Sequence, residues 1–291
     1  MGADLQPYGN VLALADEVTG LPITELRLHG PLERLTATDV AQPAVVAVSL
    51  AALDVLRSHV PELSYAAVAG HSVGEYAAYV AAGVFDPRTA LALVHVRAQA
   101  MLAACQAVDG IMAAVIGLDL EPLRVACAEA SRDGSSIEVA NMNAPGQLIV
   151  SGARDALDRL SDRAKAAGAR RIAPLNVGGP FHSIYMRLAA DPVARVVAAA
   201  EMRSPRVPVV LNASADVGVS PDQLREELVV QVYSPVRWIE TLDRLQTLGC
   251  ERFLEVGPGQ VLAGLVKRTL PSARVASFGS LGDLDAARAL L

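Results

Sequence analysis

The chain has 291 residues, 52% of them apolar and 19% charged, with 25 basic and 31 acidic side chains and a net charge of −6. This acidic balance argues against a nucleic-acid binder, whose footprint is normally basic, and the apolar fraction favours a globular protein with a sizeable core over disorder. The longest apolar runs, such as residues 44–53, fall short of the roughly 20 residues that span a bilayer, so we expect no membrane association.

The N-terminus has no basic segment followed by an apolar run, and no export signal is therefore expected. The three cysteines, Cys105, Cys127 and Cys250, are odd in number and far apart. Such usage favours a reducing compartment and neither a disulfide framework nor a zinc site. We therefore expect a soluble protein of the cytoplasm.

The chain is expected to start irregularly and then to form a long helix. Gln42-Pro43 opens this apolar helix, which runs to about His59, and the proline stands in the first turn, where its missing N–H costs little. Residues 65–69 form a short buried strand that leads through a glycine-containing turn at 70–74 into a second helix. A further helix is expected over residues 87–104.

The pattern changes near Gly110, where shorter strands alternate with two helices. The expected elements are a strand at 111–116, a helix capped by Asp119, strands at 137–141 and 147–151, a helix with Leu157, Leu160 and Ala164 on one face, and a strand at 170–176. The order βαββαβ is that of ferredoxin-like folds. We expect residues 106–178 to form a small domain inserted into a core made of residues 1–105 and 179–291.

The rest of the chain again alternates strands with helices. We expect a strand at 207–212, a helix that starts with a capping box formed by Ser220 and Gln223, a helix at 235–248, a strand at 253–256 and a helix at 261–269. Such alternation predicts a mostly parallel sheet covered on both faces. The fold class is therefore α/β.

Gly70-x-Ser72-x-Gly74 between a strand and a helix is typical of a nucleophile elbow. Small residues on both sides of the serine let the chain turn sharply and present the hydroxyl at the carboxyl edge of the sheet. The first N–H groups of the following helix then point at the same place and can stabilise an oxyanion. The alternative is an ordinary strand-to-helix turn. We interpret Glu75, in the first turn of that helix, as structural.

An activated serine needs a base, and His182 in a glycine- and proline-rich loop is one candidate, although the residues alone leave this open. His71 adjoins the serine and is expected to line a wall. Arg97 lies in a strongly apolar helix, either as a surface side chain or as a planar fork for a substrate carboxylate. Asn143, at a strand end, belongs to a turn or to the edge of a polar pocket.

Segments along almost the whole chain are similar to those of a known family. They are Gln42-Pro43-Ala44, Gly70-His71-Ser72-Val73-Gly74-Glu75, Arg97 with Met101, residues 112–117, Asn141-Met142-Asn143-Ala144-Pro145-Gly146-Gln147, Gly179-Pro180-Phe181-His182-Ser183, Gln231 before Ser234-Pro235-Val236-Arg237-Trp238, and Glu255-Val256-Gly257-Pro258-Gly259. In this order they resemble the malonyl-CoA:acyl carrier protein transacylase family, which includes the acyltransferase domains of fatty-acid and polyketide synthases.

The resemblance implies a hydrolase-like, mostly parallel sheet core with an inserted ferredoxin-like small domain. It implies Ser72 as nucleophile and His182 as its base, with Gln231 orienting His182 through a main-chain carbonyl. Further roles follow in the same way: the Val73 N–H as an oxyanion donor, Arg97 as the ligand of a malonyl carboxylate, and Gln42, His71, Asn143 and Phe181 as further substrate contacts. Phe181 followed by His182 resembles members that take malonyl rather than methylmalonyl groups.

The implied activity is transfer of a malonyl group from malonyl-CoA to the phosphopantetheine thiol of an acyl carrier protein, through a seryl ester. The implied partners are the carrier protein and the coenzyme A thioester, with no metal or other cofactor, and we expect a monomer. Two alternatives stay open at this point. One is a serine esterase or thioesterase, which shares the elbow; the other is a catalytically impaired relic that binds carrier protein.

The second alternative comes from a departure at the N-terminus. The family begins with a strand and a Gly-Gln-Gly-Ser-Gln loop whose first glutamine helps to form the oxyanion hole. This sequence opens with Met1-Gly2-Ala3-Asp4-Leu5, which resembles the segment after that loop. If this strand and loop are missing from the protein, the sheet loses a strand and the site loses a donor, and the loss of such a donor costs about 10²–10³ in rate.

Overall fold

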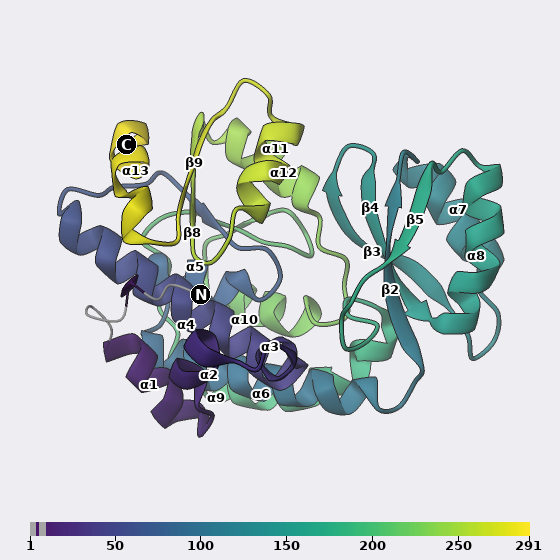
Figure 1. Cartoon of the computed structure of the whole chain (residues 1–291), viewed down its shortest axis with the longest axis horizontal. Coiled ribbons are helices and arrows are strands. Elements are labelled where there is room, and N and C mark those ends of the chain that lie inside the picture. The colour runs from purple at the N-terminus through teal and green to yellow at the C-terminus, as the bar shows by residue number, and fades with distance from the viewer. Residues whose placement is uncertain (1–3, 6–9) are drawn as a thin grey trace.

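The structure is a computed structural model that describes residues 4–5 and 10–291 (Figure 1). Met1, Gly2 and Ala3 of the opening segment therefore lie outside the described residues. The helices are α1 (Asn10–Thr19), α2 (Ile23–His29), α3 (Leu32–Thr36), α4 (Thr38–His59), α5 (Gly74–Ala81), α6 (Pro87–Cys105), α7 (Leu120–Ala130), α8 (Arg154–Ala166), α9 (Ala190–Ala199), α10 (Pro221–Val230), α11 (Trp238–Thr247), α12 (Val261–Thr269) and α13 (Leu284–Leu290), with short 3-10 helices η2 (Ile184–Ala189) and η3 (Leu281–Asp283).

The strands form three small sheets in an α/β fold. They are β1 (Val68–Ala69), β2 (Gly110–Ile116), β3 (Ile137–Ala144), β4 (Gln147–Ala153), β5 (Arg171–Pro174), β6 (Val209–Val210), β7 (Val217–Gly218), β8 (Arg252–Val256) and β9 (Arg274–Phe278). The three sheets have the orders β1-β6-β7, β3-β4-β2-β5 and β8-β9.

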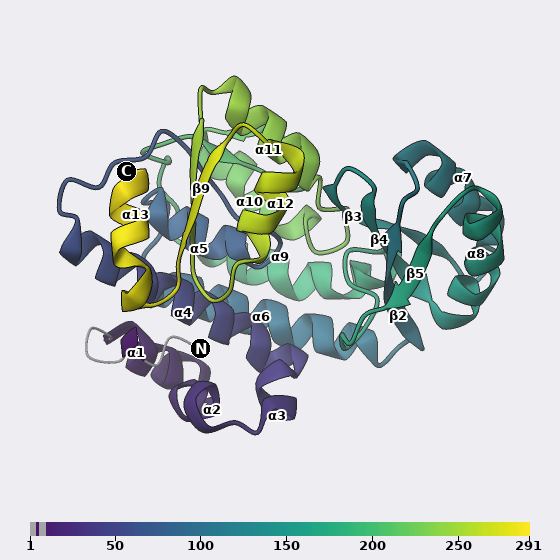
Figure 2. The same cartoon turned by 45° about the horizontal axis from the view of Figure 1, so that its top comes forward.

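The expected irregular start is wrong for the described residues, because α1, α2 and α3 precede the long helix and lie against it (Figure 2). The long helix α4 begins at Thr38, so Pro43 stands inside it and not in its first turn. A proline in a helix interior costs about 3 kcal/mol. Burial of the apolar side chains that follow it, including Val46, Val48 and Leu50, offsets this cost.

By length and composition α4 could cross a membrane. However, 72% of its most apolar window is buried inside the protein. It packs against α1, α5 and α6 and against the shorter α2 and α3. Its apolar character is that of a core helix.

The predicted single parallel sheet is divided in the described part of the chain. β1 pairs with β6 in parallel, β6 pairs with β7 antiparallel, and β8 pairs only with β9, again in parallel. Between β1 and β8 lies a cavity of about 1030 Å³, lined by residues 66–70, residues 251–258 and one face of α4. With no strand between them, β1 and β8 each have one pairing partner, and β1 and β6 are shorter than the sequence predicts.

The four-stranded sheet lies at one end of the molecule with α7 and α8 on one of its faces (Figure 1). Its strands are antiparallel throughout, and its elements follow the predicted order β2-α7-β3-β4-α8-β5. Asp119 stands at the N-cap of α7, but its side chain makes no capping hydrogen bond, contrary to the prediction.

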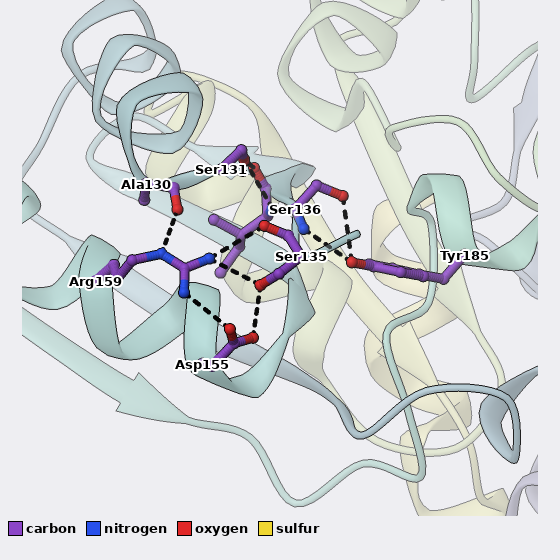
Figure 3. Close-up of polar contacts among 8 residues, drawn as sticks. Ala130, Ser131, Ser135, Ser136, Asp155, Arg159 and Tyr185 are labelled. Atoms are coloured by element: carbon purple, nitrogen blue, oxygen red, sulfur yellow. Dashed lines mark hydrogen bonds and ion pairs between the residues drawn. The ribbon is translucent and has the colours of Figure 1, made fainter. Parts of the chain in front are cut away.

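Polar contacts join this sheet to the segment that carries η2 (Figure 3). The hydroxyl of Tyr185 in η2 accepts the N–H of Ser136 at 2.8 Å. Arg159 of α8 fixes the same turn, since its Nη1 donates to Asp155 and its Nη2 to the hydroxyl of Ser135, at 2.8 Å and 2.7 Å. The turn before β3 is thus bonded to Tyr185, which lies only three residues after His182 in the chain.

Several predicted elements agree with the structure, and others are displaced for local reasons. The helix expected at 235–248 begins at Trp238, because Val236 is bonded to β3: its N–H donates to Ala140 and its carbonyl accepts from Met142. Ser220 caps α10 by accepting the N–H of Gln223, but the Gln223 side chain accepts the N–H of Val219, so the reciprocal bond of a capping box is not made.

Candidate active site

The turn between β1 and α5 has the geometry that the elbow pattern predicts. Ser72 has φ 51°, in the left-handed region that non-glycine residues rarely occupy. A Cβ on Gly70 would lie 2.1 Å from the carbonyl carbon of Gly74, so Gly70 cannot be replaced without moving the turn. A Cβ on Gly74 would meet nothing within 4 Å. Only the first glycine of the motif is therefore required sterically.

His182 reaches the serine from the loop that follows β5. Its Nε2 lies 2.6 Å from Ser72 Oγ, and its Nδ1 lies 2.9 Å and 3.1 Å from the carbonyl oxygens of Gln231 and Ser234. Because carbonyl oxygens only accept, Nδ1 carries the proton and Nε2 is free to accept the proton of Ser72. His182 itself has φ 56°, so both partners are held in left-handed backbone conformations.

Burial, together with the positive Arg97 and nearby His71, lowers the pKa of His182 to about 3. The imidazole is therefore neutral near pH 7 and can act as a proton acceptor. No carboxylate touches Nδ1 among the described residues. The main-chain carbonyl of Gln231 instead occupies the position that an acid has in a Ser-His-Asp triad.

Arg97 lies beside the serine and not at the surface. It is 1% exposed; its Nη1 donates to Gln42 Oε1, and its Nη2 donates to Gln231 Oε1 at 2.9 Å and to Ser72 Oγ at 3.1 Å. Its Nε is buried without an acceptor in the described residues. Burial lowers the pKa of Arg97, but a guanidinium stays charged at neutral pH. The surface alternative is therefore wrong.

The remaining predicted residues also lie around the elbow. The N–H of Val73 makes no hydrogen bond within the described ranges and stands at the N-terminus of α5, where an anion is favoured. His71 Nε2 lies 2.8 Å from Asn143 Oδ1, and its ring packs edge-on against Trp238. Burial lowers the pKa of His71. Phe181 precedes His182 and packs against the small apolar cluster of Met112, Ala140 and Ile149.

Asn212 was not predicted from the sequence. It follows β6, and since β6 runs parallel to β1, both carboxyl ends meet at one edge. Its Oδ1 accepts the N–H of Ser72 and its Nδ2 donates to the carbonyl of Gly70, both at 2.6 Å. A polar residue at the end of a predicted apolar strand was the available signal.

Glu75 has more contacts than its predicted place in the first turn of α5 indicates. It is fully buried and accepts hydrogen bonds from the N–H of Asn212 at 2.7 Å and from Nε2 of Gln231 at 2.5 Å. Nearby Glu227 accepts the N–H of Ala213 at 2.7 Å. No sequence pattern indicated these contacts, because they join residues 137 and 156 positions apart.

Comparison with known proteins identifies the family. The sequence profile described as "Acyl transferase domain" matches residues 12–287. The malonyl CoA-acyl carrier protein transacylase of Bacillus subtilis is 40% identical over 256 residues, which are 87% of this chain and 80% of that protein.

Two solved structures are similar over nearly the whole chain. The acyl carrier protein S-malonyltransferase of Vibrio cholerae superposes with a TM-score of 0.92 at 38% identity, covering 98% of this chain and 94% of that one. A malonyl-transacylase in complex with its type II PKS acyl-carrier protein gives 0.91 at 38% identity, covering 98% and 93%. The chain therefore belongs to the acyl transferase domain family, among the malonyl CoA-acyl carrier protein transacylases.

Proposed function

We propose that this protein transfers a malonyl group from malonyl-CoA to the phosphopantetheine thiol of an acyl carrier protein. The observation that carries the proposal is the contact of Ser72 Oγ with His182 Nε2 at 2.6 Å, beside the buried cation of Arg97. The nucleophilic hydroxyl thus contacts both a neutral base and a cation that can bind a carboxylate. The names of the similar proteins support the same substrates.

In the first half-reaction Ser72 Oγ attacks the thioester carbon while His182 Nε2 takes the hydroxyl proton. The carbon–sulfur bond breaks, the proton passes to the sulfur, and coenzyme A leaves as a thiol. In the second half-reaction the phosphopantetheine thiol gives its proton to His182 and attacks the seryl ester. The ester bond breaks, the proton returns to Ser72 Oγ, and the malonyl thioester of the carrier protein leaves.

Groups around the elbow stabilise the charges that develop in the transition state, which are the oxyanion and the protonated imidazole. The free N–H of Val73 lies at the N-terminus of α5 and supplies one oxyanion donor. The carbonyl of Gln231 holds the imidazole and stabilises it once protonated. Preorganised donors of this kind cost no reorganisation during the reaction.

The acyl group is selected by Arg97, whose guanidinium binds the free carboxylate of malonyl while Gln42 holds it from α4. The unpartnered Nε of Arg97 supports this role, since a buried donor gains an acceptor when a carboxylate enters. His71, Asn143 and Phe181 contribute further contacts to the substrate. A methyl branch is worth only about 1–3 kcal/mol of discrimination, and Phe181 beside His182 favours malonyl over methylmalonyl.

We also interpret residues 106–178 as a ferredoxin-like insert in a hydrolase-like core made of residues 1–105 and 179–291. The antiparallel order β3-β4-β2-β5 and the chain order βαββαβ support this division. We propose a cytoplasmic monomer that needs no metal or other cofactor. Light scattering tests the monomer, and activity retained after dialysis against a chelator tests the independence from metal.

The function is tested with radiolabelled malonyl-CoA and a carrier protein bearing phosphopantetheine. We expect label on the carrier with wild-type protein and none with Ser72→Ala. Release of free malonate without labelled carrier would instead indicate a thioesterase. Carrier binding with neither product would indicate a non-catalytic protein.

A further inference from the structure

Glu75 is a buried acid whose two oxygens are both used inside the site. Oε1 accepts the N–H of Asn212 at 2.7 Å, and Oε2 accepts Nε2 of Gln231 at 2.5 Å. The residue is 0% exposed, so the described contacts and not water satisfy the carboxylate. A buried acid costs free energy unless such donors surround it.

The two residues bound to Glu75 also bind the main chain of the nucleophile Ser72. Asn212 accepts the N–H of Ser72 at 2.6 Å, and Gln231 Nε2 donates to the carbonyl of Ser72 at 2.9 Å. Both main-chain groups of the serine are therefore bound by side chains of residues that Glu75 holds, Gln231 through its side-chain amide and Asn212 through its main-chain N–H. Since Ser72 has φ 51°, its conformation persists only where its surroundings enforce it.

Glu75 also determines which way the Gln231 amide points. A carboxamide has one accepting end and one donating end, whereas a carboxylate only accepts and a guanidinium only donates. Nε2 must therefore face Glu75, and Oε1 must face Arg97, whose Nη2 donates to it at 2.9 Å. The same Nη2 lies 3.1 Å from Ser72 Oγ. Gln231 thus connects the buried anion to the buried cation.

We propose that Glu75 is a positioning residue for acyl transfer: it fixes the main chain at Asn212 and the side-chain amide of Gln231 and, through Gln231, orients Arg97 toward the acyl group. This inference rests on the proposed function of Ser72 and Arg97. Burial, with Glu227 nearby, raises the pKa of Glu75. The two N–H donors on its oxygens favour the ionised form, because the hydroxyl oxygen of a neutral carboxyl group is the weaker acceptor.

The test variant is Glu75→Gln, which keeps the shape of the side chain but turns one acceptor into a donor. Either the N–H of Asn212 or Nε2 of Gln231 then faces an NH₂ group, and the orientation of Gln231 is no longer fixed. The readout is the ratio of malonyl-serine to acetyl-serine formation. We expect this ratio to fall about tenfold, since only the malonyl group needs an oriented Arg97.

The matched control is Glu227→Gln. Glu227 is a neighbouring buried acid, 5% exposed, that accepts the N–H of Ala213 and, like Glu75, lies against the N–H of Asn212, but binds neither Arg97 nor the side chain of Gln231. We expect it to keep the wild-type ratio. An unchanged ratio in Glu75→Gln, or an equal fall in both variants, would overturn the inference, because a structural role changes both acyl groups alike.

Each ratio is measured within one preparation, so it does not depend on the folded fraction. If Glu75→Gln does not fold, Glu75→Asp replaces it: the charge remains, but the shorter side chain reaches only one of the two donors. We expect an intermediate ratio, and a wild-type ratio overturns the inference. Wild-type protein that forms no malonyl-serine overturns the proposed function itself, a result distinct from malonyl-serine formation with an unchanged ratio.

Discussion

Arg97 holds a positive charge that is 1% exposed, and a cation so deeply buried persists only where acceptors surround its donors. Gln42 and Gln231 supply neutral acceptors, which leaves the charge itself uncompensated by direct contact. A substrate carboxylate completes this arrangement. We therefore propose that the buried arginine selects acyl groups that carry a free carboxylate.

Arg97→Ala tests this selection. We expect malonyl transfer to fall about 10- to 100-fold, because a charge-assisted hydrogen bond is worth about 1.5–3 kcal/mol. Acetyl transfer should fall much less, since acetyl has no carboxylate to bind. The measurement compares labelled carrier protein formed from malonyl-CoA and from acetyl-CoA. Equal losses for the two acyl groups would remove the carboxylate role of Arg97.

The lowered pKa of His182 predicts how the free energy of unfolding depends on pH. Its pKa falls from 6.5 in the unfolded chain to about 3 in the fold, chiefly through burial. Below pH 6.5 the unfolded chain takes up a proton that the folded protein does not, so this stabilisation is complete above pH 6.5 and is lost progressively toward pH 3.

The free energy of unfolding should therefore decrease on acidification by up to about 1.4 kcal/mol per pH unit from this residue. His182→Gln, which does not titrate, should show a shallower decrease between pH 6.5 and 4. Urea unfolding across this range gives both slopes. Identical slopes would contradict a neutral, buried imidazole.

At the scale of elements, the elbow depends on one glycine of the motif and not on both. A Cβ on Gly70 would lie 2.1 Å from the carbonyl carbon of Gly74, whereas Gly74 has open space at the start of α5. We expect Gly70→Ala to abolish malonyl-serine formation. Gly74→Ala should retain it and stabilise the protein by about 0.4–1 kcal/mol, because alanine loses less backbone entropy on folding.

Intact-protein mass spectrometry after exposure to malonyl-CoA, together with thermal unfolding, checks this pair of variants. The steric account is wrong if Gly70→Ala still forms malonyl-serine at the wild-type rate. It is equally wrong if Gly74→Ala is as damaging as Gly70→Ala, since the two positions would then have the same steric requirement.

How far the sequence predicts the elements depends on how local their signals are. α12 has the predicted bounds and α6 ends one residue later than predicted, since apolar runs within each segment, and for α6 the starting proline, determine them. β1 is cut to Val68–Ala69 because its length depends on neighbouring strands, which no local pattern contains. The bridge between Val236 and β3 shortens α11 for the same reason.

The residues of the candidate site also differ in whether a local sequence signal indicates them. Ser72 carries its own motif. The residues offered His182 and Arg97 as candidates with alternatives open, and the resemblance to a family supplied their roles and added Gln231. Asn212 and Glu75 remained hidden, because Asn212 meets the elbow across 140 residues and its role exists only once β6 lies beside β1. Tertiary contacts of this kind leave no periodicity in the sequence.

At the scale of the molecule, basic side chains from two distant segments meet near the four-stranded sheet. Arg170, before β5, lies against Gly117, and Arg268 of α12 reaches Gln147 and the neighbourhood of Gly146. Gly117 and Gly146 are themselves joined by a main-chain hydrogen bond. The two arginines thus form a positive patch on a protein of net charge −6, and such a patch suits a partner with an acidic surface.

Charge reversal tests this patch. Arg170→Glu and Arg268→Glu should each raise the KM for carrier protein about three- to tenfold, an effect that salt weakens, and should leave malonyl-serine formation unchanged. Arg203→Glu is the control, because Arg203 lies beside Val84, beyond the end of α5 opposite to Ser72. Carrier kinetics that are the same in all three variants would place docking elsewhere.

The most direct test of the account is the mass of the intact protein after brief incubation with malonyl-CoA. We expect a single malonyl adduct on the peptide that contains Ser72, its loss when holo carrier protein is added, and no adduct in Ser72→Ala. A protein that stays unmodified, or an adduct that persists in Ser72→Ala, would contradict acyl transfer through this serine.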